Sequence, residues 1–459
     1  MTVNKSLLHL DTQAVRRQFP GLEKGAVCLN NGSGALVYKG AIERYCRIAV
    51  MTERYNAANT SAHSIVRTMS APHMNLRGLD SKSMVDVKER TAQYAKLASF
   101  MNADPDEIAK TLLIKTLNAI ANFCPVVNKA FGPSTTGMLR TLTNSLRPNL
   151  NTDSEIIVSV LCHEAGNTAW VALAQSLGIS IKWWAPEGGI GNNRDPKLSL
   201  DTLRPLLSSK TRLVCCGHVS NITGTIEPIK EIAKLVHTIS EALICVDGVA
   251  WAPHRPIDVK DLDVDFYVFS WYKVFGPHIA QIYARRKVQK RYLTSLNHYF
   301  FDPTALHVRL GLGNSCLELE HAVTPIITHL VDHVGWDAII AHEELITAEI
   351  LGYLTANSDL YTVYGCATAD AKARVSLISF SVKGLASDKV AEVIHETSNF
   401  RIITGDCWSP RTVHDVIGLP DYGILRTSLV HYNTVEEMRA FTQKLDQVVR
   451  SMKYETLSS

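Results

Sequence analysis

The sequence has little net charge, no paired-cysteine motif and no long apolar run. Its 47 basic and 44 acidic side chains leave a formal net charge of +3, which gives no reason to expect nucleic acid or an anionic membrane as a partner. No apolar stretch has the length of a transmembrane helix, and the first residues, MTVNKSLLHLDTQAVRRQF, form a short amphipathic stretch rather than a signal peptide. None of the ten cysteines stands in a CxxC pair, which is typical of reduced thiols and argues against a disulfide framework or a zinc site. We therefore expect a cytoplasmic protein without a metal centre.

The order of apolar runs predicts the fold class. The chain has 459 residues, of which 46% are hydrophobic, and this length favours two or more domains. From about residue 150, strand-like runs such as SEIIVSVL, TRLVCCGHVS and EALICVDGV alternate with helical patterns such as NTAWVALAQSLG and LSLDTLRPLLSS. This rhythm predicts a mostly parallel sheet with helices on both faces. From about residue 330, long helical patterns and the strands ARVSLISFSV and GILRTSLV predict a smaller α+β domain.

Two ionisable residues stand where apolar strands end. Asp247 closes the run ALICVD, and Lys273 follows the next strand, in FSWYKVFGP. A carboxylate at the carboxyl end of a parallel strand lies where ligands of open α/β sheets bind, and a lysine in apolar surroundings is easily neutralised and then reacts with carbonyl compounds. Pyridoxal phosphate (PLP) needs both, a lysine for its aldehyde and an acid for its ring nitrogen. A turn or cap role for Asp247, or a buried ion pair of the two, is the alternative.

A phosphate site and a ring partner are also present. In AFGPSTTGMLRTL a Gly-Pro turn and Ser134, Thr135 and Thr136 precede an apolar periodic run, so backbone N–H groups at a helix start can bind a phosphate. Met138 stands where a nucleotide-triphosphate loop has its lysine, which excludes that motif. His163 follows the run SEIIVSVLC and is a candidate to stack on the cofactor ring, with a capping or core histidine as the alternative.

Four longer motifs combine into a family resemblance. CHEAGNTAW, HVSNITGT, VDGVAWAPHRPIDVKDLDVDFYVFSWYKVFGP and LRTSLVHYNTVEE resemble, in order and spacing, the class V aminotransferases, the cysteine-desulfurase-like branch of fold-type I PLP enzymes. The resemblance covers most of residues 10–450. It implies an N-terminal segment that packs on the small domain (1–35), a large PLP-binding α/β domain with a mostly parallel seven-stranded sheet between helices (36–325) and a small α+β C-terminal domain (326–459). It also implies a homodimer with shared active sites.

The resemblance assigns roles residue by residue. It implies that Lys273 binds the cofactor's aldehyde, that Asp247 partners the ring nitrogen and that His163 stacks on the ring. It places Asn221 at the phenolic oxygen and Arg426 at the substrate's α-carboxylate, for which a two-pronged donor is suited. The other cofactor-binding residues that it implies are Thr135, Thr136 and Ser270 at the phosphate and, from a neighbouring subunit, Ser315. We expect Ser134, at the same helix start, and Tyr272, beside the lysine, to bind the cofactor as well. The other substrate-binding residues that it implies are Asn31 and Ser33.

Some positions depart from the family pattern. The glutamine usual three residues after the aspartate is Ala250, and the histidine usual before the lysine is Tyr272. The loop TGDCWSPRTVHD places Cys407 close to, but not clearly at, the position of the desulfurase nucleophile. We therefore interpret Cys407 as a residue of the pocket wall.

The stretch from HTISEALICVDGV to SLNHYF is similar to fungal PLP enzymes of ustiloxin-type mycotoxin pathways that are decarboxylative aldolases. The similarity implies that the enzyme removes the β-carboxylate of L-aspartate and adds the resulting enamine to an aldehyde, which gives a γ-hydroxy-α-amino acid. Candidate walls for the aldehyde are Trp271, Tyr272 and Trp408. The alternatives are a cysteine desulfurase, an amino-acid epimerase or lyase, and a non-catalytic PLP-binding homologue.

Two stretches look additional by comparison with that group, within about residues 51–70 and 110–129. We interpret one or both as retained introns, and sequencing the transcript decides between this interpretation and real insertions.

Overall fold

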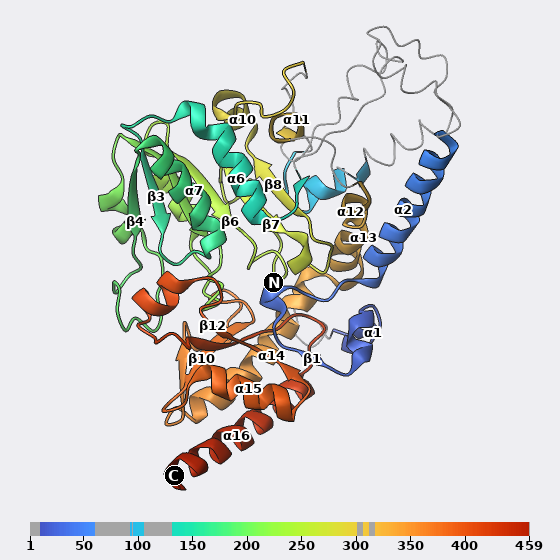
Figure 1. The fold of residues 1–459 in the computed structure, drawn as a ribbon, viewed down its shortest axis with the longest axis vertical. Coiled ribbons are helices and arrows are strands. Elements are labelled where there is room, and N and C mark those ends of the chain that lie inside the picture. Colours follow the sequence, from blue (N-terminus) through green and yellow to red (C-terminus); the bar gives the residue numbers. More distant parts are fainter. Residues whose placement is uncertain are drawn as a thin grey trace, which may run out of the picture.

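The computed structural model describes residues 10–59, 92–93, 95–104, 131–300, 306–311 and 317–458. The chain forms a larger part around a seven-stranded sheet and a smaller part around a four-stranded sheet, one above the other along the long axis (Figure 1). The predictions on Ser315 and on residues 110–129 lie outside the described residues, as does most of the stretch 51–70.

The large sheet is mostly parallel, as the sequence predicts. Its strand order is β2-β8-β7-β6-β5-β3-β4, in which β4, β3, β5, β6 and β7 run parallel and β8 runs antiparallel to both of its neighbours. The strands are β2 (Phe131–Gly132), β3 (Glu155–Ser159), β4 (Ser180–Trp184), β5 (Thr211–Gly217), β6 (Leu243–Asp247), β7 (Phe266–Ser270) and β8 (Ala280–Ala284).

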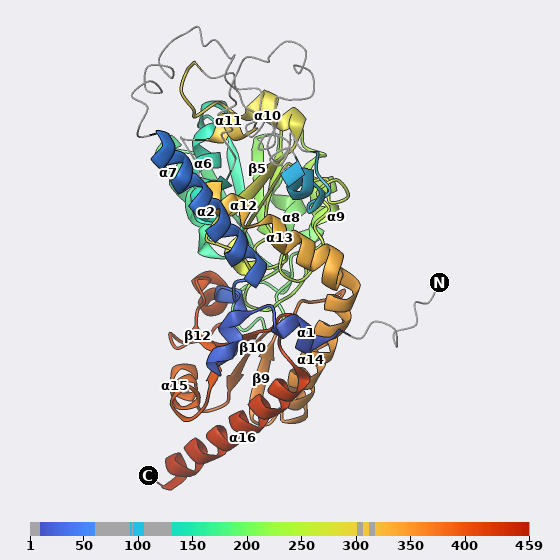
Figure 2. The same ribbon diagram turned by 90° about the vertical axis from the view of Figure 1, so that its right-hand side faces the viewer.

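Helices cover this sheet on both faces, because the side chains of a strand alternate between its two sides. On β3, Ile156 and Val158 pack in one buried cluster with α6 (Thr135–Leu146) and α7 (Glu164–Leu177). Ile157, between them, packs in another cluster with α9 (Ile229–Val236). Figure 2 shows the two layers on opposite sides of the strands. Within the described ranges, the other α-helices of the larger part are α2 (Lys39–Asn59), α8 (Leu200–Leu203), α10 (Arg286–Tyr292), α11 (Leu306–Leu310), α12 (Leu317–His321) and α13 (Thr324–Ile327).

The smaller part is α+β, also as predicted. Its antiparallel sheet has the order β12-β13-β10-β9. Its elements are α14 (Trp336–Ala356), β9 (Tyr361–Tyr364), β10 (Leu377–Val382), α15 (Ser387–Thr397), β11 (Phe400–Arg401), β12 (Ile403–Gly405), β13 (Ile424–Ser428) and α16 (Val435–Ser458). After α1 (Thr12–Arg16), β1 (Val27–Cys28) pairs in parallel with β11, so the N-terminal segment contacts the small part. The domain limits at residues 35 and 325 stay predictions.

One predicted helix is shorter than the sequence pattern indicates. The stretch LSLDTLRPLLSS forms only the short α8 and a 3₁₀ turn, Arg204–Leu206. Pro205 explains the difference, because proline lacks the N–H that an α-helix needs in its interior and clashes with the preceding turn.

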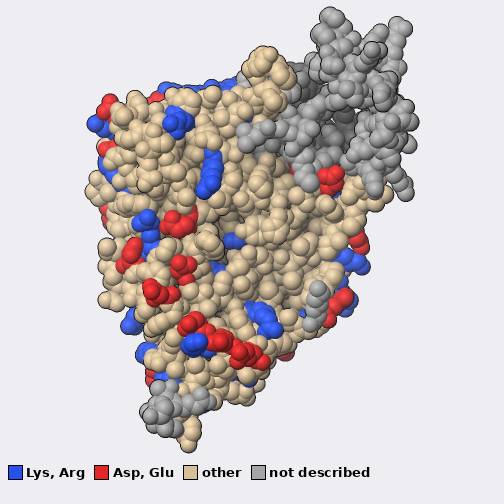
Figure 3. Space-filling model, viewed as in Figure 1, with Lys and Arg blue, Asp and Glu red and all other residues tan. Residues whose placement is uncertain are grey.

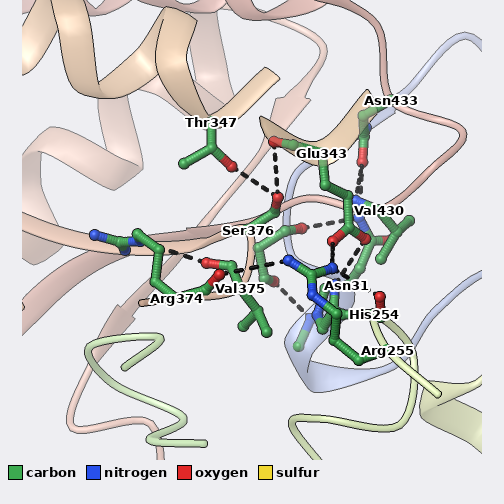
Figure 4. Close-up of polar contacts among 12 residues, drawn as sticks. Asn31, His254, Arg255, Glu343, Thr347, Arg374, Val375, Ser376, Val430 and Asn433 are labelled. Carbon is green, nitrogen blue, oxygen red and sulfur yellow. Dashed lines mark hydrogen bonds and ion pairs between the residues drawn. The ribbon is translucent and has the colours of Figure 1, made fainter. Parts of the chain in front are cut away.

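A buried polar network joins the two parts (Figure 4). Glu343 on α14 accepts hydrogen bonds from Arg255 Nη1 at 2.7 Å and contacts His254 Nδ1 at 2.8 Å. Its backbone carbonyl accepts from Ser376 Oγ. Glu343 is 1% exposed and Arg255 5%, so each charge depends on the other for compensation.

This pairing gives a stability prediction. We expect Glu343→Gln to lower the free energy of unfolding by about 3–5 kcal/mol, because the guanidinium of Arg255 stays buried without its counter-charge. Glu349→Gln on the same helix is the matched control, since Glu349 pairs with a largely exposed Arg439 at 3.2 Å and should cost less than about 1 kcal/mol. Urea unfolding of both variants measures the difference. Equal losses in the free energy of unfolding of the two variants would contradict this prediction.

On the face drawn in Figure 3, small acidic and basic groups lie side by side among other residues. Among the helices in the described ranges, none combines the length and the apolar character needed to cross a bilayer. Within the same ranges, no cluster of three or more His, Cys, Asp or Glu side chains could hold a metal ion.

Candidate active site

A cavity lies at the carboxyl ends of the parallel strands, where the loops of the large sheet meet the small part. Residues far apart in the sequence line it, because strand ends β5, β6 and β7 and the starts of α6 and α7 converge there. The predicted site residues that line it are Asn31, Ser134, Thr135, Thr136, His163, Asn221, Asp247, Ser270, Tyr272 and Lys273.

Lys273 stands in a 3₁₀ turn, Trp271–Lys273, directly after β7. Its Nζ lies 5.8 Å from the centroid of the Tyr272 ring. Burial and the positive charge of Arg426 lower the pKa of Lys273 to about 8, against the opposing effects of Asp247 and Cys407. The structure thus makes this amine easier to neutralise than an ordinary lysine, which is what attack on a carbonyl requires.

Asp247 ends β6, and its Oδ1 accepts from the Val249 N–H at 2.9 Å. Burial raises the pKa of Asp247, although the Val249 N–H and Lys273 oppose the shift. The start of α7 lies close by, since a Cβ added at Gly166 would be 3.5 Å from Asp247 Oδ2. A buried carboxyl at this point can partner a protonated ring nitrogen.

His163 is the N-cap of α7, and its Nδ1 accepts from the Ala165 N–H at 3.0 Å. Burial and the charges of Lys273 and Arg426 lower the pKa of His163 to about 3. The ring is therefore neutral, with its proton on Nε2, and such a ring can stack on an aromatic cofactor. The capping role that the sequence left open and a cofactor role are compatible.

The other end of the cavity has the donors of a phosphate site. The Thr135 N–H donates to Ser270 Oγ at 3.0 Å, and the two hydroxyls lie 2.8 Å apart. Ser134 caps the twelve-residue helix α6 by accepting from the Gly137 N–H at 3.1 Å. Hydroxyls and a helix N-terminus together favour a bound phosphate.

Arg426 on β13 is buried at 3% exposure. Its Nη1 donates to the Asn221 carbonyl at 2.8 Å, and its Nη2 lies 3.3 Å from Ser33 Oγ. Among the described residues no carboxylate pairs with this guanidinium, and its Nε has no hydrogen-bond partner. A buried guanidinium that lacks a paired carboxylate is suited to bind an anionic ligand.

Two of the three residues predicted to form a wall for the aldehyde do not line the cavity. Trp271 as an aldehyde wall is wrong, because it is fully buried, contacts Phe100 at 5.0 Å between ring centroids and donates to Gln281. Trp408 is 74% exposed and is not part of the cavity wall, whereas Tyr272 is.

Asn31 lines the cavity, but its amide is engaged within the protein. It donates to the Ser428 carbonyl and to Asn433 Oδ1, and it accepts from Tyr432 Oη. Ser33 reaches the site through Arg426 rather than as a lining residue of the described cavity. Direct substrate contact by Asn31 and Ser33 stays a prediction.

The sequence reasoning missed other lining residues, among them His254, Leu377 and Val430. It also missed Ser409, whose Oγ donates to Asn221 Oδ1 although the two residues are 188 positions apart in the sequence. No local spacing signals such a contact, because the two loops belong to different parts of the fold.

The lowered pKa of Lys273 gives a pH prediction. Only the neutral amine attacks an aldehyde, so the rate of PLP attachment should rise about tenfold per pH unit below the pKa and level off above pH about 8. Stopped-flow absorbance after mixing apoprotein with PLP measures the rate. A rate still climbing at that slope near pH about 10 would give the amine an ordinary lysine pKa instead.

Comparison with known proteins agrees with this geometry. The chain matches the family model of the class V aminotransferases over residues 107–441. It is 44% identical to the "Cysteine desulfurase-like protein ustD" of Aspergillus flavus, over 96% of this chain and 91% of that protein. It is 47% identical to the "Nonribosomal peptide synthetase-like enzyme fsqF" of Aspergillus fumigatus over 95% of this chain, but it spans only 27% of that protein's length.

Solved structures share the fold. The cysteine desulfurase from Thermococcus onnurineus superposes with a TM-score of 0.73 at 20% identity, over 96% of this chain and 99% of that one. The cysteine desulfurase CsdA from Escherichia coli gives a TM-score of 0.72, also at 20% identity, over 96% and 98%.

The chain therefore belongs to the class V aminotransferase family and is a PLP-dependent enzyme of fold type I. The residues present fit the cofactor: a neutralisable amine at 273, a buried acid at 247, a neutral imidazole at 163 and hydroxyls at a helix start. Lys273 would hold the aldehyde end, Asp247 the ring nitrogen, and Ser134, Thr135, Thr136 and Ser270 the phosphate.

Proposed function

We propose that this enzyme joins L-aspartate to an aldehyde with loss of CO₂ and forms a γ-hydroxy-α-amino acid. The β-carboxyl carbon leaves as CO₂. The electron pair it leaves at Cβ forms the new bond to the aldehyde carbon, whose oxygen takes up a proton. The observation that carries the proposal is Arg426, a buried guanidinium without an acidic partner among the described residues, whose charge acts on the amine of Lys273.

Arg426 is suited to hold the α-carboxylate of the amino acid. Its Nη1 is fixed by the Asn221 carbonyl, so the guanidinium is already oriented before the substrate binds. Its Nε has no hydrogen-bond partner among the described residues, so the positive charge is not balanced within that part of the protein. Because the guanidinium is buried, a carboxylate there forms strong charge-assisted hydrogen bonds.

Lys273 is suited to move a proton at the substrate's Cα. When bound, PLP supplies an electron sink conjugated to the carbon atoms of the amino acid. With the cofactor and the amino acid bound, the side chain of Lys273 would be available as a base at Cα. Its pKa of about 8 is close to neutral pH, where a general base is most effective.

The cavity wall favours the aldehyde over water as the second reactant. Leu161, Val249, Leu377 and Val430 are apolar lining residues, and Ala250 stands where the family usually has a polar glutamine. An apolar wall limits water near the carbon nucleophile, and protonation from water would give alanine instead.

The desulfurase alternative needs a reactive thiolate, and the structure argues against one at Cys407. The residue is 7% exposed and packs in a buried apolar cluster. Burial raises the pKa of its thiol, although Arg426 and Lys273 oppose the shift. A thiol that resists ionisation is a poor nucleophile.

The test is to incubate the PLP-loaded protein with aspartate carrying ¹³C at its β-carboxyl carbon, with and without an aromatic aldehyde. We expect labelled CO₂, together with an unlabelled product whose mass is that of aspartate plus aldehyde minus CO₂. Sulfide from cysteine would support the desulfurase instead, racemised amino acid the epimerase, and a folded protein that turns over none of these the non-catalytic homologue.

We also propose that the enzyme is a cytoplasmic homodimer. What supports the dimer is apolar surface on α2, where Ile42 is 43% and Tyr45 40% exposed. Light scattering coupled to size exclusion measures the mass, and a monomer at assay concentration would contradict the dimer.

A further inference from the structure

The side-chain amide of Asn221 is held from a distant loop. Ser409 Oγ donates to Asn221 Oδ1 at 2.9 Å, and Asn221 Nδ2 donates to the Cys407 carbonyl at 3.1 Å. Ser409 is fully buried. Asn221 follows β5 of the large sheet, whereas Cys407 and Ser409 follow β12 of the small sheet, so the contact crosses between the two parts.

These two hydrogen bonds permit one orientation of the amide. A backbone carbonyl can only accept, so the nitrogen of Asn221 must face Cys407, and the Ser409 hydroxyl must then donate to the oxygen. Among the described residues, the Cys407 carbonyl is the one acceptor that Nδ2 contacts, so its second N–H has no partner there. Asn221 lines the cavity with Lys273, so a ligand bound there lies beside this amide.

The loop that supplies both groups is held rigidly in an unusual conformation. Cys407 and Trp408 have φ angles of +49° and +59°, a region that residues other than glycine rarely adopt. Asp406 Oδ1 accepts from the Trp408 N–H at 2.9 Å, and the Trp408 carbonyl accepts from the Glu164 N–H at 2.8 Å. The turn is thus fixed at both ends, and Ser409 follows it directly.

We propose that Ser409 is a positioning residue that orients the Asn221 amide, so that its remaining N–H is presented to the cofactor's phenolic oxygen. Ser409 does not line the cavity itself, so it would act on the cofactor's electronic state through Asn221. The inference rests on cofactor binding at this site, and it is independent of which amino acid or aldehyde the enzyme uses.

The test is an absorbance titration of the PLP-loaded protein against pH, without substrate. A hydrogen-bond donor at the phenolic oxygen stabilises the form of the cofactor that has lost its proton, and so lowers the pH midpoint of the absorbance change. Ser409→Ala frees the amide to turn, so we expect the midpoint to rise by about one pH unit. Asn221→Ala should give a similar shift, and the double variant should add nothing further, because the two changes remove one interaction.

Ser379→Ala is the matched control. Ser379 is also fully buried, and its hydroxyl donates to the Ile222 carbonyl in the same loop, so its loss weakens the loop without releasing the Asn221 amide. We expect its midpoint to equal that of the wild type. Ser409→Cys, which keeps the size but offers a weaker donor, should shift the midpoint in the same direction by less, and it serves if Ser409→Ala does not fold.

An unchanged midpoint in Ser409→Ala, or an equal shift in Ser379→Ala, would overturn the inference. A wild-type spectrum that does not respond to PLP would overturn the cofactor site itself. If the enzyme does not use an aldehyde, the proposed function is wrong, but the shift of the midpoint in Ser409→Ala is still expected.

Discussion

Replacing Lys273 by alanine should abolish turnover, with a loss of at least about 10³-fold in kcat, because the residue is proposed both to bind the cofactor and to move the Cα proton. The variant should also lose the absorbance band of covalently bound PLP. Non-covalent PLP should remain, since Ser270, Thr135 and the start of α6 are unchanged. Steady-state kinetics and an absorbance spectrum after desalting measure the two effects.

Lys389→Ala is the control for general effects of losing a lysine. Lys389 lies on the exposed surface of α15 and pairs with Glu392 at 2.9 Å, so the substitution should change neither rate nor spectrum. A Lys273→Ala protein that keeps the covalent band would contradict the role of Lys273.

Replacing Arg426 by lysine should raise the KM for the amino acid by about 10- to 100-fold, because lysine keeps the charge but loses the planar fork that pairs with a carboxylate. The effect on kcat should be smaller, since the α-carboxylate is bound in the ground state and the transition state alike. The same variant also loses the hydrogen bond to the Asn221 carbonyl, which would lower kcat if Asn221 moves.

Arg439→Lys is the matched control, because its pairing with Glu349 is largely exposed and should contribute little. Kinetics over a range of aspartate concentrations separate KM from kcat. An unchanged KM in Arg426→Lys would mean that the carboxylate binds elsewhere.

Local patterns were sufficient for the central residues of the site. Asp247 ends one apolar strand and Lys273 follows the next, and parallel strands bring their carboxyl ends to one edge of the sheet. The two residues could therefore be placed together without the structure. The start of α6 could also be predicted from a local pattern, because its cap residue precedes a run of apolar residues at helical spacing.

Other features depend on contacts that no local pattern contains. Trp271 stands next to Tyr272 in the same turn, yet it lies in the core because it packs on Phe100 and binds Gln281, while Tyr272 faces the cavity. The contact of Ser409 with Asn221 requires the two parts to be docked on each other. Tertiary packing decides these cases, and spacing along the chain does not.

The account depends most on the amine at position 273, and one measurement tests it directly. The PLP-loaded protein is reduced with borohydride and digested, and the peptide carrying the reduced cofactor is identified by mass. We expect the label on the peptide containing Lys273 and on no other. A label on another lysine, with Lys273 unmodified, would contradict the account of the site.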